Sequence, residues 1–242
     1  MRLLSKLLNI GAIAALTALT GCGTPPVAEV DAAKIRTIHT VTVIYPGKTV
    51  YGGARAQVPA AAGGLLGIAL NSLTSANTAK ENARSLDDLV TAKLGDTKLN
   101  RRFTDGIEAA LRAHGYVVKE ADASAPTLPT FSMDDHFDWH ASGPAYRDSD
   151  AVLLIRVTPM YSSNGPMSAY TRFVRGEIVM FTADTHEAVF RQRVYWMKTI
   201  DPYTYHFMQD IEADLPRAIS GLDESMMAQV DLFDKSLSSD AH

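Results

Sequence analysis

The chain has 242 residues, of which 46% are hydrophobic, and its 23 Lys and Arg against 27 Asp and Glu give a formal net charge of −4. A chain of this length can bury a complete hydrophobic core in one domain. Its mild acidity, with no stretch rich in Lys and Arg, argues against nucleic acid as a partner.

The N-terminal segment has the features of a secretory signal. Arg2 and Lys6 precede an uncharged run, Leu7 to Gly21, whose 15 residues are fewer than the roughly 20 that span a bilayer. The only cysteine of the chain, Cys22, follows directly. The four residues Leu19-Thr20-Gly21-Cys22 resemble the lipobox of bacterial lipoproteins. An ordinary signal peptide followed by a chance cysteine is the alternative interpretation.

The resemblance implies a processing step and a location. The signal peptide, residues 1–21, would be cleaved between Gly21 and Cys22, and Cys22 would become the acylated N-terminus that attaches the protein to a membrane. Gly23 stands where an aspartate commonly retains such proteins in the inner membrane, so the resemblance implies the periplasmic face of the outer membrane. Acyl chains contribute about 0.8 kcal/mol per buried CH₂ and need no spanning helix.

The mature chain is predicted to begin with a flexible tether, residues 22–34, followed by a single periplasmic α/β domain over residues 35–242. The sequence from Ile35 to Pro46 alternates apolar and polar residues and is rich in β-branched types, which predicts the first strand.

A Gly/Ala-rich segment, residues 58–79, is predicted to be a helical insertion without charged residues. Gly63, Gly64 and Gly67 form a small-residue surface against which another helix or backbone can pack closely. Three interpretations remain open, namely a buried helix or helical hairpin of this domain, a surface for a partner or a second copy, and a segment that dips into the membrane.

Helical periodicity returns over residues 80–95 and again up to Gly115, and residues 116–120 then read as a short strand. Residues 121–149, which contain Pro126, Pro129 and Pro144, are predicted to be a long irregular loop. Three long strands follow over 150–161, 168–182 and 188–200, and an amphipathic helical element spans roughly 208–237 with a kink or a new start at Pro216.

This order of elements predicts an α+β fold of layered α/β type. Its mixed sheet would carry a C-terminal antiparallel three-stranded meander, with helices packed on it. The layout resembles small α/β domains of envelope lipoproteins, such as the penicillin-binding-protein activator LpoB and the N-terminal domain of TolB. The resemblance is one of layout alone, and the segment 58–79 departs from it.

The predicted irregular loop contains the residues that are the best candidates for metal ligands. If the loop is extended, His136, Asp138 and His140 point to one side, where their nitrogen and oxygen donors could bind a divalent metal. A structural zinc site needs a fourth ligand, and no cysteine is free to supply it. The alternative is a polar loop anchored by Phe137 and Trp139.

A second candidate site lies on the last predicted strand. Arg191 and Arg193 share one face and could pair with anionic groups, or they could simply belong to an exposed sheet face. No Gly-x-Ser-x-Gly, His-Glu-x-x-His or phosphate-loop motif occurs in the sequence, and no cofactor is indicated.

We therefore expect a non-enzymatic, lipid-anchored envelope lipoprotein that binds or regulates an envelope assembly. Its partners would be the membrane, through the acyl anchor, and an envelope protein whose identity the sequence leaves open, as it does the oligomeric state. The alternative is a lipid- or metal-binding envelope protein that uses residues 58–79 or 134–140.

Overall fold

The computed structural model describes residues 28–55, 85–163, 168–197 and 201–239. The predictions for Cys22 and for Gly63, Gly64 and Gly67 lie outside these residues. The described strands are β1 (Ala28–Val30), β2 (Thr40–Tyr45), β3 (Gly52–Arg55), β4 (Val117–Asp122), β5 (Thr130–Met133), β6 (Trp139–Ser142), β7 (Ala151–Ser163), β8 (Thr171–Thr182) and β9 (Ala188–Met197). The described helices are α2 (Ala32–Ile35), α4 (Leu86–Leu94), α5 (Leu99–Ala113), α6 (Met208–Ala213) and α7 (Leu215–Ser239).

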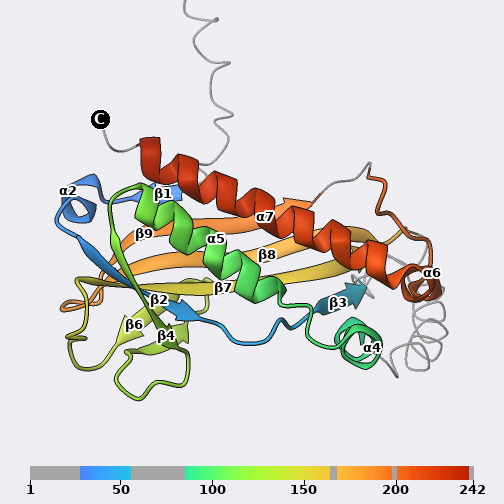
Figure 1. The fold of residues 1–242 in the computed structure, drawn as a ribbon, viewed down its shortest axis with the longest axis horizontal. Helices are drawn as coiled ribbons and strands as arrows, with labels where there is room; N and C mark the ends of the chain where they lie inside the picture. The colour runs from blue at the N-terminus through green and yellow to red at the C-terminus, as the bar shows by residue number, and fades with distance from the viewer. Residues whose placement is uncertain (1–27, 56–84, 164–167, 198–200, 240–242) are drawn as a thin grey trace, which may run out of the picture.

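The fold is a seven-stranded mixed sheet with helices packed on it, which confirms the predicted α+β class (Figure 1). The strand order is β1-β9-β8-β7-β2-β4, and β3 pairs with the far end of β7. Strands β7, β8 and β9 form the predicted antiparallel meander, whereas β2 runs parallel to both β4 and β7. The parallel β2–β4 pair follows from the helical crossover that connects these two strands.

Helices α5 and α7 lie side by side across one face of the sheet (Figure 1). Each helix presents an apolar stripe to the strands, and Phe233 of α7 meets Phe190 of β9 edge-on at 5.2 Å between ring centroids. Pro216 is the second residue of α7, where a helix has no need of that backbone N–H. The element predicted over 208–237 is therefore two helices, and the second begins at Leu215, one residue before Pro216.

The N-terminal part of the domain differs from the prediction. Residues 28–30 form β1, which pairs antiparallel with β9, and Asp31 caps α2 by accepting a hydrogen bond from the Lys34 backbone N–H. The predicted tether 22–34 is therefore too long, because residues from Ala28 onward belong to the folded domain. The first predicted strand, 35–46, begins only at Thr40. A three-residue edge strand is too short to show the alternation that reveals a strand.

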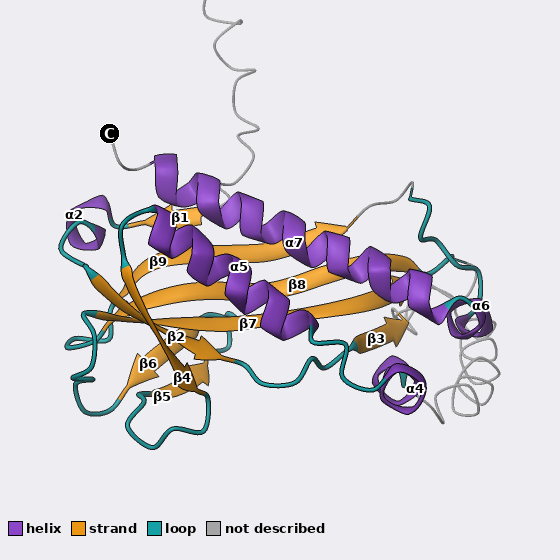
Figure 2. Cartoon of the chain, in the orientation of Figure 1, coloured by secondary structure: helices purple, strands orange, loops and turns teal. Residues whose placement is uncertain are grey.

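The second face of the sheet is only partly covered. Strands β5 and β6 form a hairpin within the segment predicted to be an irregular loop (Figure 2). Phe131 of the hairpin packs on Phe181 of β8 with ring centroids 5.9 Å apart, and Trp139 also joins this second apolar cluster. Among the residues that the structure describes, no helix has both the length and the apolar composition needed to cross a membrane.

Candidate functional site: a basic groove on the free face of the sheet

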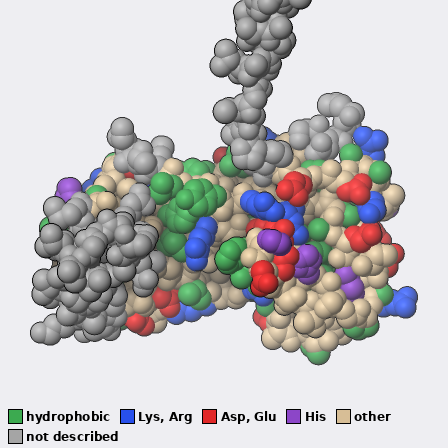
Figure 3. Space-filling model, turned by 180° about the vertical axis from the view of Figure 1, so that it is seen from behind, with side chains coloured by type: hydrophobic (Ala, Val, Ile, Leu, Met, Phe, Trp, Pro, Cys, Tyr) green, Lys and Arg blue, Asp and Glu red, His purple; other side chains and the backbone are tan. Residues whose placement is uncertain are grey.

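Beyond the hairpin, the face of the sheet opposite α5 and α7 carries a groove of about 650 Å³. Figure 3 views the molecule from this side and shows apolar and basic side chains lying together near its middle. The loop after β2, the turn of the hairpin and the strands β7, β8 and β9 enclose the groove. Its polar and rim residues are Lys48, Val50, Met133, His136, Phe137, Asp138, Trp139, Arg156, Thr158, Arg175, Glu177, Arg193 and Tyr195.

Strand register places the groove side chains on one face. Residues directly opposite each other in neighbouring strands point to the same side of a sheet. One row across the meander is therefore Arg156, Glu177 and Arg193, and the next is Thr158, Arg175 and Tyr195.

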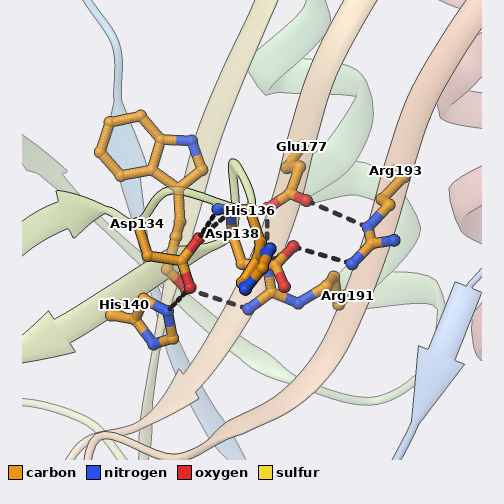
Figure 4. A network of polar contacts seen from close by, with 8 residues as sticks. Asp134, His136, Asp138, His140, Glu177, Arg191 and Arg193 are labelled. Atoms are coloured by element: carbon orange, nitrogen blue, oxygen red, sulfur yellow. Dashed lines mark hydrogen bonds and ion pairs between the residues drawn. The ribbon is translucent and has the colours of Figure 1, made fainter.

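An ionic network joins the hairpin to the sheet at one wall of the groove (Figure 4). The Arg191 guanidinium donates to Glu177 at 2.6 Å and to the Trp139 carbonyl at 3.0 Å. Arg193 donates to Asp138 at 2.8 Å and lies 3.4 Å from the other oxygen of Glu177. Burial raises the pKa of Glu177, whereas the charge of Arg191 opposes that rise. The network fixes the position of Trp139 over β7.

The turn of the hairpin is built on Asp134. Its carboxylate accepts hydrogen bonds from the backbone N–H groups of His136 and Asp138, at 2.8 and 2.9 Å, and lies 2.9 Å from Nε2 of His140. The His140 contact and these N–H groups lower the pKa of Asp134 to about 2. Phe137 adopts a positive φ of 66°, which is rare for a bulky residue, and its side chain is 72% exposed.

The structure does not support the predicted metal site at His136, Asp138 and His140. The turn at Phe137 breaks the two-residue alternation on which the prediction depends. His140 is bonded to Asp134, and Asp138 is bonded to Arg193. No group of three metal-ligating side chains occurs in the part of the chain that the structure describes. The alternative interpretation, a polar loop anchored by Trp139, agrees better with this geometry, although Phe137 points outward.

The groove contains two guanidinium groups without a described ionic partner. Arg156 lies over the Trp139 ring, 5.5 Å from its centroid, and neither Arg156 nor Arg175 forms an ion pair within the described ranges. Burial lowers the pKa of Arg156. Glu177 stands directly opposite Arg156 in the ladder, yet its carboxylate is bonded to Arg191. The groove therefore holds a half-buried positive charge for which the described residues supply no ion pair.

Apolar side chains form the rim of the groove. Val50, Met133, Phe137 and Tyr195 are between 51% and 75% exposed. They are four of the eight large hydrophobic residues that are exposed in the described part of the chain, so exposed apolar surface is concentrated here. Tyr195 rests edge-on against Phe173 at 4.8 Å. Such concentration is characteristic of binding surfaces.

The sequence prediction identifies one wall of this site and misses its centre. Arg191 and Arg193 do share a face, but their anionic partners are Glu177 and Asp138 of the same chain. The sequence patterns do not single out Arg156 and Arg175. The sequence feature that could have revealed this part of the site is Arg156 itself, the single charged residue within the apolar strand Ala151–Ser163.

No protein-family model matches this chain, and a search of curated proteins also found no match. Function therefore has to be inferred from the groove and from the N-terminal sequence.

Proposed function

We propose that this protein is a non-enzymatic lipoprotein of the cell envelope, anchored by acylated Cys22 at the periplasmic face of the outer membrane, that binds a component of an envelope assembly. The observation that carries the proposal is the groove, where two guanidinium groups without described ionic partners lie beside a rim of exposed apolar side chains. This combination favours a ligand with both an anionic and an apolar part.

A binding role is favoured over catalysis by the state of the groove carboxylates. Asp138 and Glu177 are both bonded to arginines of the same chain. A general acid or base must be able to exchange a proton with its substrate, and these two carboxylates are instead used to hold the hairpin on the sheet.

The anchor is tested by mass spectrometry of the protein from its native membranes. We expect the N-terminal peptide to begin at Cys22 and to carry acyl groups. The matched control is Cys22→Ser, which should give no N-terminal peptide that begins at residue 22 and carries acyl groups. An unmodified thiol at Cys22 in the native protein would refute the anchor.

The groove is tested by photo-crosslinking in intact cells. A photoreactive residue in place of Tyr195, at the rim, should give an adduct with an envelope component. The same residue in place of Val117, which is 58% exposed on β4 and away from the groove, should not. The adduct from position 195 should disappear in Arg156→Gln/Arg175→Gln. Equal labelling from both positions would contradict a specific site in the groove.

The alternative function, lipid binding through residues 134–140, has support of its own. Residues 136–139 line the groove, and the side chain of Phe137 is 72% exposed. The version that uses residues 58–79 lies outside the described residues, and the metal-binding version is not supported by the geometry.

A further inference from the structure

We propose that the groove binds the phosphate head group of an anionic phospholipid, and that the free face of the sheet lies against the membrane to which Cys22 is anchored. This inference rests on the proposed function, because the anchor determines which membrane is within reach.

The charge in the groove is suited to a phosphate. Guanidinium groups bind phosphate oxygens through paired N–H donors, and such bonds are stronger where water is partly excluded. Arg156 is half-buried beneath the rim, and Arg175 is exposed beside it. Lys48 adds a third cation, whose ammonium group bonds only the neutral Thr91 hydroxyl among the described residues. An incoming anion would satisfy donors that the chain itself leaves unused.

The rim of the groove is suited to the membrane interface. Tyrosine and other aromatic residues favour the head-group region, where one end of the side chain is apolar and the other is hydrated. Tyr195 is 75% exposed and Phe137 is 72% exposed, and both line the groove. Both rings can therefore enter the interface while the guanidinium groups of the same groove meet phosphates.

The position of β1 sets an upper limit on the distance between Cys22 and this rim. Ala28, the first residue of β1, pairs with Gln192, which is one residue from Arg193 and three from Tyr195 in β9. With strands about 4.8 Å apart and about 3.4 Å per residue, Ala28 lies roughly 11 Å from Tyr195 along the sheet. Cys22 precedes Ala28 by six residues in the sequence, which span at most about 21 Å. The rim is thus within roughly 32 Å of the acylated residue.

An acidic segment of a protein partner would also satisfy the two arginines. The short connection to Cys22 favours the lipid, because phospholipid head groups are always present at that distance from the anchor. A protein partner is one outcome of the experiment below.

The test uses the chain from residue 22 with Cys22→Ser, which contains every described element but has no acyl anchor. We measure its sedimentation with vesicles of phosphatidylcholine and with vesicles of equimolar phosphatidylcholine and phosphatidylglycerol. We expect binding only to the second kind. Arg156→Gln/Arg175→Gln should bind about 25-fold more weakly, since each basic side chain at an anionic surface contributes roughly fivefold. Arg147→Gln/Lys235→Gln, which removes two exposed cations outside the groove, should bind like the parent chain.

A single substitution keeps the test independent of any folding defect. Arg175→Gln changes only an exposed side chain and should weaken binding about fivefold, whereas Lys235→Gln should not. The inference is overturned if the groove variant and its control lose the same affinity, or if the parent chain does not bind anionic vesicles. A protein adduct at position 195 in cells, with no vesicle binding, would assign the groove to a protein partner. Because the assay omits the anchor, its outcome is separate from the acylation of Cys22.

Discussion

The close approach of β7 and β8 beneath the groove gives the strongest prediction for stability. Gly176 of β8 has a φ of 144°, and a Cβ at this position would overlap the carbonyl oxygen of Arg156 and lie 2.8 Å from Cα of Val157. The substitution Gly176→Ala therefore combines backbone strain of about 1–3 kcal/mol with overpacking of about 1–3 kcal/mol. We expect a loss of about 4 kcal/mol, which in a domain of this size lowers Tm by about 8–16 °C.

The matched control is Gly47→Ala. Gly47 also has a positive φ, 83°, but no atom lies within 4 Å of the position that a Cβ would occupy there. Its substitution should cost only the strain, about 1 kcal/mol, or about 3 °C. Urea unfolding and calorimetry of the chain from residue 22 measure both changes. Equal losses for the two variants would refute the reasoning, because backbone strain alone would then account for Gly176.

Two further predictions concern charged groups. Arg172→Gln should lower the free energy of unfolding, measured in urea, by about 3–5 kcal/mol, because it leaves the buried Asp201 carboxylate without its partner. Arg156→Gln should change the same free energy by less than about 1 kcal/mol. Similar losses for the two variants would contradict this distinction. Because the pKa of Asp134 is lowered to about 2, its stabilisation of the hairpin turn is complete above its ordinary pKa of 3.8 and is lost as the pH falls from there toward 2. Trp139 fluorescence should report this loss, and Asp134→Asn should remove the transition; an unchanged acid transition in that variant would count against the assignment.

The part of the fold that the sequence predicts well is the part with long periodic elements. The strands β7, β8 and β9 are ten residues or longer and carry apolar runs that only a buried sheet explains. Helix α5 repeats its apolar residues every three to four positions, from Leu99 to Leu111, and all of these side chains are buried. Long elements bury enough surface for local pattern and tertiary packing to agree.

The short elements escape prediction because their stability comes from distant residues. Strand β1 exists through its pairing with β9, about 160 positions away in the sequence. The β5–β6 hairpin is held by Arg191 and Glu177, which bond the backbone of Trp139. The sequence of residues 121–149 alone does not indicate that Arg191 and Glu177 will bond this hairpin. A segment with three prolines therefore appears irregular although it contains a hairpin.

The candidate site shows the same division. Residues 134–140 attract attention in the sequence because histidines and aspartates occur together, and residues 136–139 of this segment do line the groove. The geometry does not favour the predicted metal chemistry, because Asp134 and Asp138 each already have a partner. Those partners, Arg193 for Asp138 and His140 for Asp134, depend on the hairpin geometry. Arg175 is inconspicuous in the sequence because nothing local distinguishes an unpaired guanidinium from a paired one.

The contrast between Arg172 and Arg156, one strand apart, is the strongest reason to regard the groove as functional. At Arg172 the fold supplies Asp201, Glu224 and two aromatic rings to a buried guanidinium, so its charge is satisfied internally. Arg156 has a carboxylate directly opposite in the ladder, and that carboxylate is bonded elsewhere. Leaving a half-buried charge unpaired costs stability. The fold pairs the charge of Arg172 completely but leaves the charge of Arg156 open to a groove with an apolar rim. An anionic ligand explains this difference better than packing alone.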